Sequence, residues 1–173
     1  MKTLVIHPKD ETTDFLSAIY KDKDYTVITD DFSNLAFHIE AHDRIMMMGH
    51  GTPQGLLNPL NNYNSFVINA AYVSLLRTKE CVCIWCNADK FVKANLMKCF
   101  HTGMIISEWN EAAMFLDLED FTDADIEESN RLFTESIANH IDEENGLKMI
   151  KESYSTSTNK VIEYNMSRIY NNK

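Results

Sequence analysis

Two apolar runs in this sequence each end at a residue that could take part in cysteine chemistry. Residues 44–48 are followed by Gly49-His50-Gly51, and residues 81–85 are followed by Cys86-Asn87-Ala88. If both runs are neighbouring parallel strands, their carboxyl ends lie at one edge of the sheet, where open α/β sheets bind ligands. The His50 imidazole and the Cys86 thiol would then share that edge. A thiol beside an imidazole is the minimum for nucleophilic catalysis by cysteine, so the pattern predicts an enzyme or a protein derived from one.

The elements that would position these residues alternate between strands and helices. Apolar runs predict five strands, at residues 2–7, 25–28, 44–48, 81–85 and 103–107. Helical spacing predicts helices at 11–21, 32–41, 70–76 and 89–99, and turn-forming residues predict a loop at 52–65. This alternation is typical of parallel βαβ units with right-handed crossovers. We therefore expect an α/β fold with a mainly parallel sheet and helices on both faces.

Individual residues give these helices their expected faces and ends. Thr12 or Thr13 could cap the helix at 11–21. Phe37 and Leu96 are expected on the buried sides of the helices at 32–41 and 89–99, although the spacing in the first of these helices is irregular.

The last third of the chain has a helical character. Thr122 and Asp125 form a capping-box pattern before an amphipathic stretch, which predicts a helix over 123–142. Apolar residues in 147–154 indicate a further helix, while residues 161–170 fit either a helix or a strand. The length of 173 residues predicts a single domain, with a sheet core in 1–110 and a mainly helical part in 111–173.

Composition limits the class of protein and its partners. The chain is 45% hydrophobic and 24% charged, which is ordinary for a globular protein, and it has a net charge of −10 and a pI near 5.0. An acidic surface repels phosphate, so we expect neither nucleic acid nor an anionic membrane as a partner. The sequence has no apolar run long enough to span a membrane and no evident secretion signal.

The four cysteines differ in their expected roles. Cys81 and Cys83 share one face inside a strand and should be buried and inert, and Cys99 is expected in the core. Cys86 follows the strand and is the candidate nucleophile. Neighbours on one strand are poorly placed for disulfides, so reduced thiols and a cytoplasmic location are expected.

The two strand ends together resemble the caspase-like cysteine peptidases, the group of caspases, metacaspases, legumains, gingipains, clostripains and separases. The residues that carry the resemblance are Ile45-Met46-Met47-Met48-Gly49-His50-Gly51 and Val82-Cys83-Ile84-Trp85-Cys86. The resemblance implies a three-layer caspase-like fold and a cysteine endopeptidase that needs no cofactor and no metal. It makes Cys86 the nucleophile and His50 the proton shuttle, with the amides of Gly51 and Cys86 holding the oxyanion. A peptide or protein is the implied substrate.

The end of the fifth expected strand would supply substrate contacts. In the family the corresponding strand end walls the specificity pocket, which makes Ser107, Glu108 and Trp109 candidate substrate-binding residues. A carboxylate from Glu108 would select a basic residue before the cleaved bond and reject an acidic one. Alternatively, Glu108 stabilises the positive end of the following helix.

Two other functions stay open. Trp85 stands where the family usually carries a small residue, and this feature and the short chain favour an inactive caspase-like module that binds a peptide or partner protein. A flavodoxin-like nucleotide-binding domain is a weaker alternative, because no glycine-rich phosphate turn follows the first expected strand.

No paired Cys or His spacing indicates a metal site. The sequence leaves the oligomeric state open.

Overall fold

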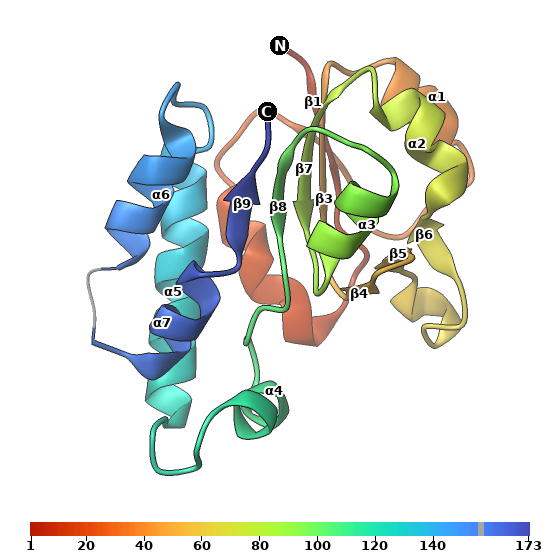
Figure 1. Cartoon of the computed structure of the whole chain (residues 1–173). Helices are drawn as coiled ribbons and strands as arrows, with labels where there is room; N and C mark the ends of the chain where they lie inside the picture. Colours follow the sequence, from red (N-terminus) through yellow and green to blue (C-terminus); the bar gives the residue numbers. More distant parts are fainter. Residues whose placement is uncertain (156–157) are drawn as a thin grey trace. The chain divides into compact units, whose positions relative to one another are not determined.

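The computed structural model describes residues 1–155 and 158–173 and divides into two compact units. We call the first the sheet unit; it comprises Met1–Asp14, Lys23–Gly103 and Tyr170–Lys173. The second, the helical unit, comprises Phe15–Asp22 and Met104–Ile169. The chain with its helices and strands is drawn in Figure 1.

The sheet unit is built on one six-stranded sheet. In spatial order its strands are β2 (Thr26–Ile28), β1 (Thr3–Ile6), β3 (Arg44–Met48), β7 (Glu80–Ile84), β8 (Phe100–Thr102) and β9 (Ile169–Asn171). The first five strands are all parallel to their neighbours. The expected α/β class with a mainly parallel sheet is therefore confirmed. The ambiguous segment 161–170 forms the end of helix α7 (Lys160–Met166) and the start of strand β9.

Three short helices contribute to the core on one face of this sheet. They are α1 (Leu35–Glu40), α2 (Val73–Leu76) and α3 (Ala88–Ala94). Their buried side chains pack with alternate residues of the central strands, including Ile45, Met47, Cys81 and Cys83. Residues of the opposite face, such as Met46, are also fully buried. Burial on both faces explains why the strands appear in the sequence as continuous apolar runs.

Two residues expected on buried helix faces are exposed instead. Phe37 is 68% exposed and Leu96 is 80% exposed. Helix α1 spans only six residues and buries Leu35 and Ile39, which are one turn apart, so Phe37 between them faces away. Helix α3 ends at Ala94, and Leu96 lies beyond it in a left-handed turn with φ 50°. The prediction for Phe37 was wrong because this residue lies on the face of α1 opposite Leu35 and Ile39, and the prediction for Leu96 was wrong because α3 ends before it.

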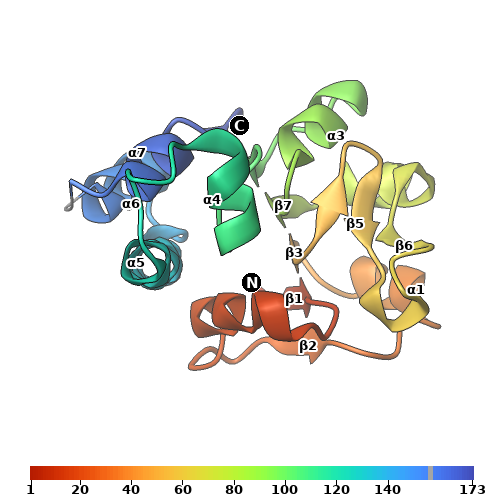
Figure 2. The same cartoon turned by 90° about the horizontal axis from the view of Figure 1, so that it is seen from below.

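The segment expected as a loop at 52–65 contains regular structure. A second, three-stranded sheet orders β4 (Gly51–Thr52), β5 (Gly55–Leu57) and β6 (Phe66–Ile68) with antiparallel pairing. The short helix η2 (Pro59–Asn61) lies between β5 and β6, and η3 (Ala70–Tyr72) leads into α2. Figure 2 shows β5 and β6 from below the view of Figure 1. The turn residues therefore connect very short strands, which apolar periodicity does not reveal.

The first expected helix is a 3-10 helix, η1 (Glu11–Ile19). Its start is fixed by Asp10, whose Oδ1 accepts hydrogen bonds from the Thr12 amide at 2.9 Å and the Thr12 hydroxyl at 2.7 Å. The capping side chain is thus Asp10 and neither Thr12 nor Thr13, so that expectation was wrong. The oxygen of the Thr12 hydroxyl keeps lone pairs with which it can accept a second hydrogen bond.

The helical unit contains α4 (Trp109–Phe115), α5 (Asp123–His140), α6 (Gly146–Tyr154) and α7. The capping box at α5 is present as predicted: the Asp125 amide donates to the Thr122 hydroxyl, and the Asp125 carboxylate accepts from the Thr122 amide. None of the helices among the described residues is long and apolar enough to cross a membrane.

The expected strand at 103–107 is absent, and the fifth strand of the sheet is β8, which ends at Thr102. The backbone N–H and C=O of Ile106 instead bind the side-chain amide of Asn165, each at 2.8 Å. Ile106 is buried with Phe121, Ile126 and other residues of the helical unit. An asparagine side chain thus satisfies the backbone groups that a neighbouring strand would otherwise pair.

Candidate functional site

Strands β3 and β7 bring the two motif residues to the same edge of the sheet. The strands are adjacent and parallel, and their last paired residues are Met48 and Ile84. The Gly49 amide continues the pairing by donating to the Ile84 carbonyl at 3.1 Å. His50 and Cys86 each follow two residues after this last pair. The strand arrangement on which the prediction rested is therefore present.

A sharp turn carries Cys86 from the strand into a helix. The Trp85 carbonyl accepts hydrogen bonds from the Ala88 amide at 3.1 Å and from the Thr102 hydroxyl at 3.0 Å. Asn87 adopts a left-handed conformation with φ 66°, and α3 begins at the next residue. Cys86 is half-buried in this turn, while the strand residues before it are buried. A strand-turn-helix of this kind presents a side chain at the end of a sheet.

The unusual Trp85 has a clear structural role beside the His50 motif. A Cβ atom added to Gly51 would lie 2.0 Å from Cδ1 of Trp85, so the indole occupies the space that this glycine leaves. The indole Nε1 also donates to the Thr52 carbonyl at 3.2 Å. Trp85 therefore joins the end of β7 directly to β4, which follows His50.

The remaining three cysteines are buried. Cys81, Cys83 and Cys99 are at most 1% exposed and belong to the core, as expected. Burial raises the pKa of Cys81 to about 12 and also raises that of Cys83. A hydrogen bond with Cys83 at 3.9 Å, together with His101, outweighs burial and lowers the pKa of Cys99 to about 6. Cys86 is the one cysteine among the described residues that is not fully buried.

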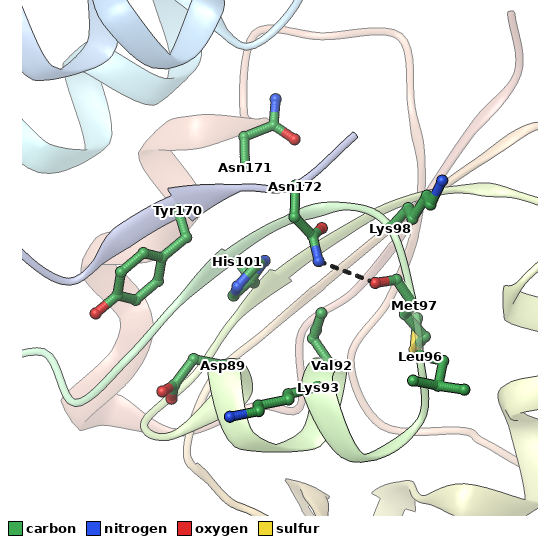
Figure 3. Close-up of a pocket in the computed structure, with 10 residues that line it drawn as sticks. All are labelled: Asp89, Val92, Lys93, Leu96, Met97, Lys98, His101, Tyr170, Asn171 and Asn172. Atoms are coloured by element: carbon green, nitrogen blue, oxygen red, sulfur yellow. Dashed lines mark hydrogen bonds between the residues drawn. The ribbon is translucent and has the colours of Figure 1, made fainter.

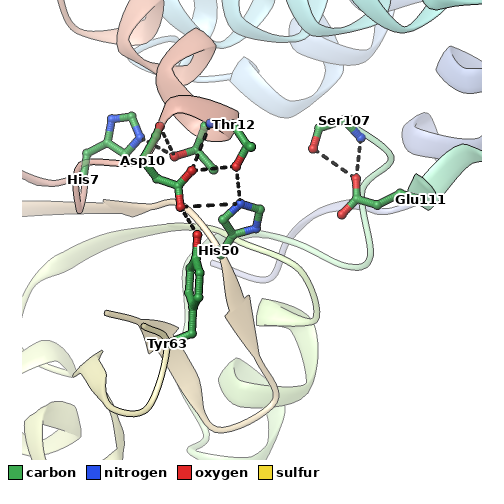
Figure 4. Close-up of polar contacts among 8 residues, drawn as sticks. His7, Asp10, Thr12, His50, Tyr63, Ser107 and Glu111 are labelled. Atoms are coloured by element: carbon green, nitrogen blue, oxygen red, sulfur yellow. Dashed lines mark hydrogen bonds and ion pairs between the residues drawn. The ribbon is translucent and has the colours of Figure 1, made fainter. Parts of the chain in front are cut away.

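His50 is held by groups at the end of another strand. Its Nε2 lies 2.6 Å from the Thr12 hydroxyl and 4.0 Å from Oδ2 of Asp10 (Figure 4). Both residues follow β1, which is the other neighbour of β3. The Tyr63 hydroxyl donates to the same Asp10 oxygen, and the Tyr63 ring packs edge-on against His50 with centroids 5.9 Å apart. These contacts fix the position of one imidazole nitrogen.

Asp10 is ionised more readily than an ordinary aspartate. Burial acts to raise its pKa, but hydrogen bonds from Tyr63 and Thr12 and the nearby His50 outweigh burial and hold the pKa below its usual range. The carboxylate is therefore charged at neutral pH. It lies close to the positive charge that His50 carries after accepting a proton.

Replacing Tyr63 with Phe should raise the pKa of Asp10, because Tyr63 provides the strongest of the hydrogen bonds that lower it. The carboxyl carbon of Asp10 can be titrated by NMR. Tyr170→Phe is the matched control, since Tyr170 stacks on His101 and does not contact Asp10. An unchanged Asp10 titration in Tyr63→Phe would show that this contact contributes nothing.

The three candidate substrate residues lie in the helical unit and do not end a strand. The Ser107 amide and hydroxyl donate to the Glu111 carboxylate at 2.7 and 3.1 Å. Glu108 is the N-cap residue of α4 without a side-chain capping bond, and Trp109 packs against Phe121 with ring centroids 4.7 Å apart. The strand-end argument for these three residues was therefore wrong, and their contact with substrate stays a prediction.

A cavity of about 730 Å³ lies along α3 in the sheet unit (Figure 3). Its size is within the range of small-molecule sites. Charged and polar groups at its wall include Asp89, Lys93 and His101, and Tyr170 stacks on the His101 ring. Neither His50 nor Cys86 lines it, so it is separate from the proposed dyad.

Comparisons with protein families, with curated proteins and with solved structures found no match to this chain. Within residues 1–155 and 158–173, no group of three or more His, Cys, Asp or Glu side chains is arranged to hold a metal ion.

Sequence reasoning missed Asp10, Thr12 and Tyr63. A signal for the first two was available, because they follow the first expected strand and so share the edge of His50. Tyr63 lies between β5 and β6, in the segment expected to be a loop, and nothing in its sequence context predicts that it meets Asp10.

Proposed function

We propose that this protein is a cysteine endopeptidase of the caspase-like type that uses His50 and Cys86 as a catalytic dyad. One observation carries the proposal: β3 and β7 are adjacent and parallel, and each places its motif residue two positions beyond the last pair, Met48 and Ile84. The half-buried position of Cys86 and the fixed Nε2 of His50 support it further. The three-layer caspase-like architecture is part of the proposal, and the mainly parallel sheet agrees with it.

The proposed reaction is a two-step acyl transfer. His50 accepts the thiol proton, and the Cys86 sulfur forms a bond to the carbonyl carbon of the scissile peptide. The carbon–nitrogen bond then breaks as His50 protonates the leaving amine. Water, deprotonated by His50, hydrolyses the resulting thioester and restores the free thiol.

The negative charge that develops on the carbonyl oxygen needs hydrogen-bond donors. We assign this role to the backbone amides of Gly51, the first residue of β4 and the neighbour of His50, and of Cys86, which follows β7. Trp85 connects these two backbone segments by packing on Gly51 and by donating to Thr52. This arrangement gives Trp85 a positioning role at the residue where the family usually carries a small side chain.

A peptide acyloxymethyl ketone tests the proposal, because such a probe binds in a peptide site and alkylates a cysteine whose thiol is activated there. The full chain is incubated with a library of probes, and the modified residue is mapped by mass spectrometry. We expect modification at Cys86, with loss of labelling in Cys86→Ala and strong reduction in His50→Ala. Reversible binding of peptides with no covalent product would contradict a peptidase and favour the peptide-binding module instead.

A further inference from the structure

We propose that Thr12 and Asp10 hold neutral His50 in the tautomer that carries its proton on Nε2, so that the lone pair on Nδ1 is the one left to accept the thiol proton. This inference rests on the proposed dyad, since it names the nitrogen that would accept the Cys86 proton. It adds two positioning residues from the end of β1. Neither residue was expected to contribute to the site.

Counting the hydrogen atoms around Thr12 supports this tautomer. A threonine hydroxyl has one hydrogen to donate, whereas an ionised carboxylate can only accept. The Thr12 hydroxyl donates its hydrogen to Oδ1 of Asp10 at 2.7 Å. Thr12 can therefore meet His50 Nε2 at 2.6 Å only as an acceptor, and the hydrogen between them must belong to Nε2.

The direction of the Thr12 hydroxyl depends on Asp10 remaining charged. Asp10 accepts from the Thr12 amide and hydroxyl through Oδ1 and from Tyr63 through Oδ2, so its hydrogen bonds all favour the ionised form. Its side chain is only 9% exposed, which limits competition from water. The carboxylate thus keeps Thr12 as an acceptor toward His50.

The loop that carries Tyr63 is held in a costly backbone conformation. Asn62 and Tyr63 both have positive φ angles, 47° and 59°, and a left-handed conformation is unusual for an aromatic residue. The Tyr63 amide stabilises it by donating to the Asn58 carbonyl at 3.0 Å. Strained residues of this kind often belong to functional sites, and here the strain accompanies the contact of Tyr63 with Asp10.

Fixing the tautomer has a direct chemical consequence. With Nε2 protonated, the lone pair of neutral His50 is on Nδ1, and this nitrogen can remove a proton from a thiol. In the other tautomer Nδ1 carries a hydrogen and cannot act as a base. Asp10, 4.0 Å from Nε2, then lies next to the imidazolium that forms.

Long-range ¹H–¹⁵N NMR of the full-length, ¹⁵N-histidine-labelled protein distinguishes the two tautomers. We expect neutral His50 to show a pyridine-like Nδ1 and a pyrrole-like Nε2 in the wild type. Thr12→Val removes the acceptor and should give a mixture of tautomers and slow the alkylation of Cys86 by about tenfold or more. Thr12→Ser keeps the hydroxyl and should restore the wild-type spectrum and a rate within about twofold.

The outcomes separate this inference from the proposed function. A wild-type His50 with a pyridine-like Nε2, or a Thr12→Val spectrum identical to the wild type, would overturn the inference even if Cys86 is reactive. If the His50 tautomer changes in Thr12→Val but the peptide probe does not modify Cys86, the tautomer assignment holds and the proposed peptidase activity is contradicted. Thermal unfolding of each variant confirms that the comparison is made on folded protein.

Discussion

Replacing Gly51 with Ala is expected to destabilise the protein by roughly 3 kcal/mol, because the added methyl group cannot be accommodated. The new Cβ would lie 2.0 Å from Cδ1 of the Trp85 indole and 2.8 Å from the Gly55 carbonyl oxygen. Both neighbours are held in place, since Trp85 is only 2% exposed and Gly55 pairs with Thr52 in the small sheet. Denaturant unfolding at equilibrium measures the loss.

A double-mutant cycle identifies the source of this destabilisation. In a Trp85→Leu background the clash with the indole is removed, so Gly51→Ala should cost at least about 1 kcal/mol less, which is the size expected for residues in contact. If the two substitutions changed the free energy of unfolding additively, Trp85 and Gly51 would not be in contact. In that case the structural role assigned to the unusual tryptophan would be wrong.

The second large effect concerns the relative reactivity of the four thiols. At neutral pH iodoacetamide should modify Cys86 at least about 100-fold faster than Cys81 or Cys83, since only the thiolate reacts. Burial raises the pKa of Cys81 to about 12 and raises that of Cys83, and both side chains are at most 1% exposed. Cys99 has a lowered pKa of about 6 but is 0% exposed, so it too should be protected.

Timed alkylation followed by peptide mass mapping measures each thiol separately. In denaturant all four cysteines should react at similar rates, which provides the control for reagent access. Faster labelling of Cys83 or Cys99 than of Cys86 in the native protein would contradict the assignment of the nucleophile.

The sheet could be predicted from the sequence because its central strands are buried on both faces. Short continuous apolar runs such as 44–48 and 81–85 are typical of strands in a parallel sheet, and both are strands within one residue of the expected bounds. The same reasoning failed at 103–107. There the apolar residues enter the core of the helical unit, and Asn165 replaces the strand partner of Ile106.

The candidate site could be predicted only in part. His50 and Cys86 follow strands that are evident in the sequence, so their shared edge follows from the topology of parallel sheets. The contact of Tyr63 with Asp10 depends on two consecutive left-handed residues between β5 and β6. Asparagine often adopts the left-handed conformation but tyrosine rarely does, so the sequence does not predict two such residues in a row at 62–63. The contact also joins residues far apart in the chain.

The central claim is that His50 activates Cys86, and the pH dependence of Cys86 alkylation tests it most directly. Rates are measured by mass spectrometry for the wild type, for His50→Ala, and for the control His42→Ala, whose imidazole binds Thr26 and the His38 carbonyl instead. We expect the wild type and the control to react rapidly well below pH ~8.5, the region where an ordinary thiol ionises. His50→Ala should react at least about tenfold more slowly at pH ~7 and become reactive only near pH ~8.5. Identical profiles for the wild type and His50→Ala would contradict the dyad.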